Sequence, residues 1–217
     1  MQLSLSGSAL KVIAMLSMTL DHIAYYFGID GLPGELMRSL GRVAFPVFAF
    51  LLVEGFVHTR SRKRYLASLL VFALISQVPW FLLNHDRTTN VFFTLALGLM
   101  AIWLLDKLGE DEVCGVGITA IFMLGALVLR ADYDWRGIVL IVLFALFRNH
   151  LPLAFLFSLP IMYVYGLVGY FLAFAVIACY NGQRGFIKGG KWTKYGFYAY
   201  YPVHLMIIWC WVHFFAD

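Results

Sequence analysis

The chain has 217 residues, of which 62% are hydrophobic, 18% aromatic and 13% charged, and its formal net charge is +4. This composition excludes a soluble domain with a polar surface, and it predicts an all-α bundle that crosses the membrane several times. The aromatic residues suit belts at the two membrane interfaces. We attribute the positive charge to membrane topology, so no nucleic-acid partner is expected.

The first hydrophobic run, residues 10–27, is long enough to cross a bilayer. The residues before it lack a basic stretch and the run has no small-residue cleavage site, so we expect no removed signal peptide. The run contains Lys11, Asp21 and His22. An ionisable side chain at membrane depth costs about 2.5 to 3.5 kcal/mol, so such residues usually face the bundle interior and serve a function.

The spacing of Lys11 and His22 places them on one face of this helix. They are eleven residues apart, which corresponds to about 20° around a helix and about 16 Å along it. Met15 and Met18 lie between them on the same stripe and suit the lining of a narrow passage. The structural alternative is that Lys11 anchors the helix end at the interface, while Asp21 and His22 hydrogen-bond to neighbouring helices.

A second polar concentration occupies residues 38–66. The span expected at residues 43–57 follows Arg42 and contains Glu54, a carboxylate that needs a partner at membrane depth. His22, Lys11 and Arg42 are the candidate partners, and a structural ion pair and a catalytic role both stay open for Glu54. The loop after this span contains four cations, Arg60, Arg62, Lys63 and Arg64. Such a cluster sets topology, holds lipid headgroups or binds the phosphates of a nucleotide-containing donor.

Two weaker polar groups follow along the chain. Asn90 precedes the span at residues 91–105, where an amide commonly makes hydrogen bonds between helices. The last span begins with an aromatic stretch that places Tyr198, Tyr201 and His204 on or near one face. This predicts a cluster of hydroxyl and imidazole groups, with an interfacial aromatic belt and a structural histidine as the alternative.

The hydrophobic runs together predict about nine membrane spans in one domain, residues 1–217. Several runs are short, so eight or ten crossings also fit. With the amino terminus in the cytoplasm, the cytoplasmic connections contain ten basic residues and the external ones five, as positive-inside topology requires. The spans are residues 10–27, 43–57, 65–83, 91–105, 116–129, 137–147, 151–165, 168–180 and 195–215. The cytoplasmic basic residues are Arg60, Arg62, Lys63, Arg64, Lys107, Arg148, Arg184, Lys188, Lys191 and Lys194, and the external ones are Arg38, Arg42, Arg87, Arg130 and Arg136.

Common catalytic and metal-binding motifs do not occur in the sequence. There is no Gly-Lys-Ser/Thr phosphate loop, HExxH pair, CxxC pair or GxSxG elbow. The cysteines at positions 114, 179 and 210 are scattered and odd in number, so we expect free thiols and no metal site.

The chain resembles the TraX family of bacterial membrane proteins over nearly its whole length. The resemblance is carried by LKVIAMLSMTLDHIAYYF, GRVAFPVFAFLLVEGFVHTRSRKRYL, FALISQVP, TLALGL and FYAYYPVHL. It implies a place in conjugative transfer and acetylation of the amino terminus of pilin. It extends to membrane O-acyltransferases, whose first span has a basic residue, ten intervening residues and a histidine, as Lys11 and His22 do. Those families more often have arginine at the position of Lys11. Their sequence Ser-Gly-Phe is replaced in this chain by Glu54-Gly55-Phe56.

Residues and resemblance together predict an acetyltransferase of the bacterial inner membrane. Acetyl-CoA would donate its acetyl group from the cytoplasmic side. The acceptor, on the other side of the membrane, would be the amino terminus of a pilin, another protein amine or a glycan hydroxyl. His22 would act as base or be acetylated itself, because imidazole works near neutral pH. We expect catalytic roles for His22, Asp21 and Glu54, and donor binding by Lys11, Arg42, Arg60, Arg62, Lys63, Arg64, Asn90, Tyr201 and His204.

Asp21 is an awkward partner for its own neighbour His22, since adjacent helical side chains point about 100° apart. A carboxylate from another span fits better, and Glu54 is the best candidate. A homo-oligomer is compatible with the sequence. The competing hypothesis is a membrane scaffold or small-solute transporter in which the same charges form a path or lock helices, although the inverted symmetry common in transporters is not seen.

Overall fold

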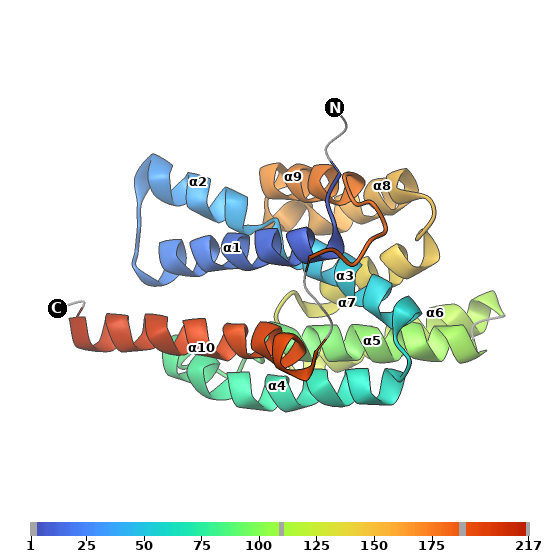
Figure 1. The fold of residues 1–217 in the computed structure, drawn as a ribbon. Coiled ribbons are helices and arrows are strands. Elements are labelled where there is room, and N and C mark those ends of the chain that lie inside the picture. The colour runs from blue at the N-terminus through green and yellow to red at the C-terminus, as the bar shows by residue number, and fades with distance from the viewer. Residues whose placement is uncertain (1–3, 109–110, 187–189, 216–217) are drawn as a thin grey trace. The chain divides into compact units, whose positions relative to one another are not determined.

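The computed structural model describes residues 4–108, 111–186 and 190–215. Across these ranges the regular secondary structure is helical, apart from two isolated β-bridges, which confirms the all-α class (Figure 1). Lys188 lies outside the described residues, as do the side chains of Lys191 and Lys194. The helices in chain order are α1 (Gly7–Tyr26), α2 (Gly31–Gly41), α3 (Ala44–His58), α4 (Arg62–Asn84), α5 (Val91–Leu108), α6 (Glu112–Val128), α7 (Asp134–Leu146), α8 (Leu151–Met162), the 3-10 turn η1 (Tyr163–Tyr165), α9 (Leu167–Ala178) and α10 (Lys191–Phe215).

The described chain divides into two compact units, and the single domain at residues 1–217 stays a prediction. Unit 1 is formed by Met1–Leu51 and Met162–Asp217, so it joins the two ends of the chain, and unit 2 is Leu52–Ile161. The boundary falls within α3 and again at the end of α8.

Unit 1 contains a helix that the sequence analysis did not predict. The segment with Gly31, Pro33 and Gly34 reads as a turn, yet it forms the start of α2. Proline is tolerated there because the first N–H groups of a helix have no intrahelical partner. α2 packs along α1 (Figure 1), and the Ser17 hydroxyl donates to the carbonyl oxygens of Leu40 at 2.6 Å and Gly41 at 2.9 Å.

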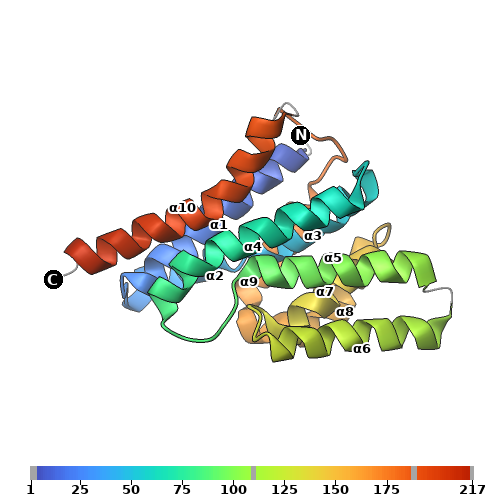
Figure 2. The same cartoon turned by 90° about the horizontal axis from the view of Figure 1, so that it is seen from below.

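α10 is the second neighbour of α1 within unit 1 (Figure 2). The start of α1 is tied to the segment that precedes α10. The Ser8 hydroxyl donates to the carbonyl oxygen of Arg184 at 2.7 Å, and the Gly7 N–H donates to that of Gln183 at 2.8 Å. α1 therefore lies between two helices that are far apart in the sequence.

Unit 2 is organised around α5, which packs against α4, α6 and α7 (Figure 2). Most of α5 is buried, including Ala96, Leu99 and Ala101, which are at most 1% exposed. Gly98 allows the close approach of α7, because a Cβ atom at this position would lie 2.3 Å from Cδ1 of Ile141. α5 is thus the core helix of this unit.

Helix length and exposure identify a membrane protein. Within the described residues, three segments are long and apolar enough to cross a membrane: Gly31–His58, Arg62–Asn84 and Val91–Leu108. On α4, Leu74 and Val78 are 66% and 59% exposed, as expected where lipid rather than water surrounds a helix. Nine crossings and a cytoplasmic amino terminus stay predictions. The shorter apolar helices are Glu112–Val128, Leu151–Tyr165 and Leu167–Ala178.

Candidate functional site

Two histidines meet where α1 contacts α10 in unit 1. Nδ1 of His22 lies 2.7 Å from Nε2 of His204. On its other side, Nδ1 of His204 lies 2.9 Å from the backbone carbonyl oxygen of Tyr200, one helical turn earlier. The result is a continuous hydrogen-bonded line from a backbone carbonyl of α10 through the imidazole of His204 to that of His22.

The geometry of the imidazole pair is that of a strong hydrogen bond. The rings are parallel within 9° and their centroids are 5.0 Å apart. That separation equals the 2.7 Å between Nδ1 of His22 and Nε2 of His204 plus about one ring radius on each side, so the rings meet edge to edge in a common plane. An N–H bond lies in the plane of its ring, so this arrangement points it along the line to the acceptor.

Aromatic side chains surround the pair. The rings of Tyr26 and Tyr201 have centroids 6.0 and 6.2 Å from that of His22. His204 is 6% exposed and Tyr201 is 4% exposed. Two members of the predicted cluster, Tyr201 and His204, have ring centroids 5.4 Å apart, and both adjoin His22.

Other contacts along α1 also reach α10. The Lys11 ammonium lies over the ring of Phe197, 5.6 Å from its centroid, and the Thr19 hydroxyl lies 2.6 Å from the hydroxyl of Tyr200. Lys11 and His22 thus both face α10, as their spacing predicts, with Lys11 itself exposed. The stripe between them has a polar member, Thr19, that the sequence analysis did not single out.

Asp21 faces α2, while His22 faces α10. A Cβ atom at Gly41 would lie 2.3 Å from Cβ of Asp21, so the two helices touch at this position. Oδ1 of Asp21 is buried and has no hydrogen-bond partner among the described residues. Arg38, in the last turn of α2, and Arg42, the C-cap residue of that helix, are close enough to act electrostatically on both Asp21 and His22.

Arg38 was not among the predicted site residues. Its guanidinium lies over the ring of Tyr25, 5.0 Å from the centroid. The signal that could have found it is its spacing of four residues from Arg42, which places both on one side of a helix. That signal depends on α2 being helical, and α2 was not predicted.

Glu54 has a partner other than those expected for it. Nε of Arg148 donates to Oε1 of Glu54 at 2.8 Å within unit 2, and the Glu54 side chain is 11% exposed. The expectation that Glu54 pairs with His22, Lys11 or Arg42 is therefore corrected to Arg148. The side chain hydrogen-bonded to Nδ1 of His22 is that of His204, an imidazole where we expected a carboxylate.

The basic loop before α4 is divided between structural and exposed cations. Arg62 pairs with Asp106 at 2.5 Å and lies over the ring of Phe56, 4.1 Å from its centroid. Arg60, Lys63 and Arg64 are exposed. Their side chains are available to an anionic ligand or to lipid headgroups.

Asn90 has a structural position at the start of α5. Its Nδ2 donates to the carbonyl oxygen of Ala73 at 2.8 Å and to Oε1 of Gln77 at 2.9 Å, both on α4. Its Oδ1 accepts the N–H of Phe92 at 3.1 Å, and the residue is 0% exposed. These bonds engage the whole amide, so we assign Asn90 to helix packing rather than to donor binding.

The predicted residues fall into both units. Those that the structure brings together around α1 are Lys11, Asp21, His22, Arg42, Tyr201 and His204, and those of unit 2 are Glu54, Arg60, Arg62, Lys63, Arg64 and Asn90. The described residues contain no group of three or more His, Cys, Asp or Glu placed to hold a metal ion.

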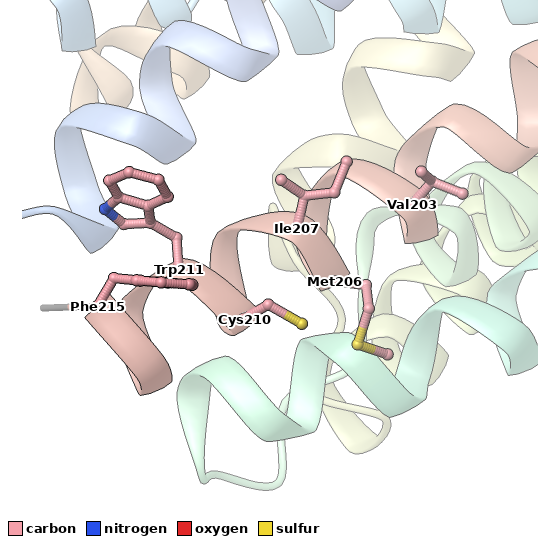
Figure 3. Close-up of a pocket in the computed structure, with 6 residues that line it drawn as sticks. All are labelled: Val203, Met206, Ile207, Cys210, Trp211 and Phe215. Carbon is pink, nitrogen blue, oxygen red and sulfur yellow. The ribbon is translucent and has the colours of Figure 1, made fainter.

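An apolar pocket lies further along α10 (Figure 3). Its volume is about 390 Å³, and its lining offers an indole N–H and the free thiol of Cys210 but no charged group. The ring of Trp211 is 6.4 Å from that of Phe27 at the end of α1. The pocket therefore suits apolar groups rather than acid–base chemistry. Its lining residues are Val203, Met206, Ile207, Cys210, Trp211 and Phe215.

Comparison with known proteins gives one family and two relatives. The family model described as TraX protein matches residues 6–212. A probable fimbrial assembly protein, FimC of serogroup H1, from Dichelobacter nodosus is 30% identical over 236 aligned residues, which cover 94% of each chain. An uncharacterized protein, RP591, from Rickettsia prowazekii (strain Madrid E) is 33% identical over 95 residues, 43% of this chain and 35% of that one. No solved structure matches the chain.

Proposed function

The chain belongs to the TraX family, and from this premise we propose that it is a membrane-embedded acetyltransferase that acts on a pilin subunit. The acetyl donor is acetyl-CoA, and the acceptor is the terminal amine of a pilin or a similar envelope protein. The similarity to a probable fimbrial assembly protein over 94% of both chains supports a place in pilus biogenesis. The site is in the bacterial inner membrane, with the amino terminus of the chain in the cytoplasm.

The observation that carries the proposal is the hydrogen-bonded imidazole pair at the contact of α1 and α10. His22 is hydrogen-bonded to His204 at 2.7 Å and lies near the aromatic rings of Tyr26 and Tyr201. A histidine held in this way suits general base catalysis better than packing alone, because its orientation is fixed by hydrogen bonds rather than by shape.

The chemical step is a transfer of the acetyl group from sulfur to nitrogen. The acceptor ammonium first loses one proton to solvent, and the amine nitrogen then attacks the thioester carbonyl carbon. A C–N bond forms and the C–S bond breaks. His22 takes the proton that leaves the attacking nitrogen and returns it to the sulfur, so that coenzyme A leaves as the thiol and the acceptor as an amide.

Donor binding is assigned to Lys11. Lys11 lies on the same face of α1 as His22 and about 16 Å away along the helix, which suits contact with a phosphate rather than with the thioester. The long pantetheine arm allows the phosphates and the thioester to be held at different depths.

The test is acetyl transfer by the full chain purified in detergent. The protein is incubated with isotope-labelled acetyl-CoA and a pilin subunit, and mass spectrometry locates the label. We expect label on the terminal amine, and no transfer to a subunit whose amine is already blocked. His22→Ala should lower the rate by about 10² to 10⁴.

The control replaces another histidine of the same unit. His213 on α10 is exposed and packs its ring against Trp209, so His213→Ala removes an imidazole without touching the pair. This variant should keep its activity. Wild-type protein without turnover on any pilin amine, or a His22→Ala variant as active as His213→Ala, would refute the proposed function.

A further inference from the structure

We propose that His204 is a positioning residue, which fixes His22 in the tautomer whose Nε2 carries the lone pair. This inference rests on the proposed function and deepens it, because it names the atom of His22 that accepts the proton. Sequence analysis placed His204 among the donor-binding residues. The contacts on both of its nitrogens support a different role.

The direction of each hydrogen bond follows from the backbone. The carbonyl oxygen of Tyr200 can only accept, so Nδ1 of His204, 2.9 Å away, must carry a proton and donate it. In neutral imidazole only one ring nitrogen carries a proton, so Nε2 of His204 has a lone pair. This lone pair faces Nδ1 of His22 at 2.7 Å, which must therefore be the protonated nitrogen of His22.

The opposite assignment is disfavoured at both contacts. If Nε2 of neutral His204 held the proton, its Nδ1 lone pair would face the carbonyl oxygen of Tyr200 at 2.9 Å with no hydrogen between them. His22 would then carry its own proton on Nε2, because its Nδ1 would have to accept. Nε2 of His22 would be a donor in that state and unable to act as a base.

The arrangement also supports the transfer step. When Nε2 of His22 takes the proton of the attacking amine, the ring becomes an imidazolium, and the existing bond from its Nδ1 to His204 becomes charge-assisted and stronger. The proton leaves from the same Nε2 to the sulfur of coenzyme A, so His204 never exchanges a proton. This is positioning through a neighbour, the role that a carboxylate more often has beside a catalytic histidine.

Other groups near His22 do not supply this function. Asp21 faces α2, where it contacts Gly41, and the side chains of Arg38 and Arg42 have donors but no acceptor for an imidazole N–H. The rings of Tyr26 and Tyr201 have centroids 6.0 and 6.2 Å from that of His22. The acceptor that the structure provides for Nδ1 of His22 is Nε2 of His204.

Two substitutions separate positioning from packing. His204→Leu removes the acceptor, whereas His204→Gln keeps a side-chain oxygen able to accept from Nδ1 of His22. We expect His204→Leu to lower kcat on the order of 10²-fold while KM for acetyl-CoA changes less than about twofold. His204→Gln should recover most of the lost rate. A residue that acts only by filling space or by binding donor would not show this rescue together with an unchanged KM.

The second readout does not depend on turnover. Nitrogen-15 NMR of histidine-labelled full chain in detergent distinguishes the two neutral tautomers, and the His22 signal is assigned by its loss in His22→Ala. Wild type and His204→Gln should show His22 protonated at Nδ1, and His204→Leu should show a mixture. Protonation of wild-type His22 at Nε2, or a His22 spectrum unchanged in His204→Leu, would overturn the inference. A wild type with the expected tautomer but no acetyl transfer would refute the proposed function alone.

Discussion

Gly41 of α2 lies against Asp21 of α1 so closely that a Cβ atom at position 41 would be 2.3 Å from Cβ and 2.9 Å from Cα of Asp21. One of these atoms belongs to the backbone, so a rotamer change cannot relieve the contact. The residue next to Asp21 is His22, whose ring meets His204 on the other side of α1. The position of the imidazole pair therefore depends on how closely α2 approaches α1.

Gly41→Ala should destabilise the protein and impair acetyl transfer. The added methyl group must push α1 and α2 apart, and overpacking of this kind costs about 1 to 3 kcal/mol. The measurement is thermal unfolding in detergent, together with the rate of transfer. Gly196→Ala on α10 is the matched control, because a Cβ atom there meets nothing within 4 Å and alanine favours helix. Equal melting temperatures for the two variants would contradict the close contact.

Lys11→Met should raise KM for acetyl-CoA by about tenfold with a smaller effect on kcat, since one charge-assisted hydrogen bond to phosphate is worth about 1.5 kcal/mol or more. Lys11→Arg should be tolerated, because guanidinium keeps the charge and adds donors. Acetyl-pantetheine, which lacks the nucleotide phosphates, should be used equally well by wild type and Lys11→Met. The measurement is kcat and KM of wild type and both variants with acetyl-CoA and with acetyl-pantetheine.

The control for Lys11 is another lysine over an aromatic ring. Lys107 lies over Trp103, 5.3 Å from its centroid, much as Lys11 lies over Phe197. Lys107→Met should leave KM unchanged. A fall in kcat without a change of KM in Lys11→Met would instead place this residue near the reaction or in a purely structural role.

Glu54→Gln should destabilise unit 2 by about 1 to 2 kcal/mol, because it leaves the partly buried Arg148 without its carboxylate. Arg148→Met should cost a similar amount, and the double variant should cost less than the sum, as expected for one shared interaction. Thermal unfolding of wild type, the two single variants and the double variant gives the interaction free energy between Glu54 and Arg148. If Glu54→Gln abolishes transfer and leaves the melting temperature unchanged, Glu54 is catalytic, which was the other role that the sequence left open.

Cysteine labelling should place the loop before α4 in the cytoplasm, as the excess of basic residues predicts. In a background with Cys114, Cys179 and Cys210 changed to serine, Arg60→Cys should resist a membrane-impermeant thiol reagent in intact cells. Arg87→Cys, in the exposed connection after α4, should react. The opposite pattern would invert the predicted topology.

The sequence by itself determined the features that depend on composition and local period. Few charged residues and long apolar runs determine a helical membrane protein, because only helices satisfy every backbone group within such runs in lipid. The helical repeat determines that Lys11 and His22 share a face, and both indeed contact α10. The family resemblance also needed only the residues.

Only the tertiary structure decided the partners of the buried polar groups. His22 and His204 are 182 positions apart, and Glu54 and Arg148 are 94 apart, so no local periodicity relates them. The sequence offered several acids and bases for each buried charge, and choosing among them depends on which helices are neighbours. α2 was missed because its glycines and proline have turn propensity, while its packing on α1 supplies the stabilisation that local propensity lacks. Which helices pack together depends on the shape and contacts of their whole surfaces, so helix neighbours can be identified from the tertiary structure but not from the local sequence.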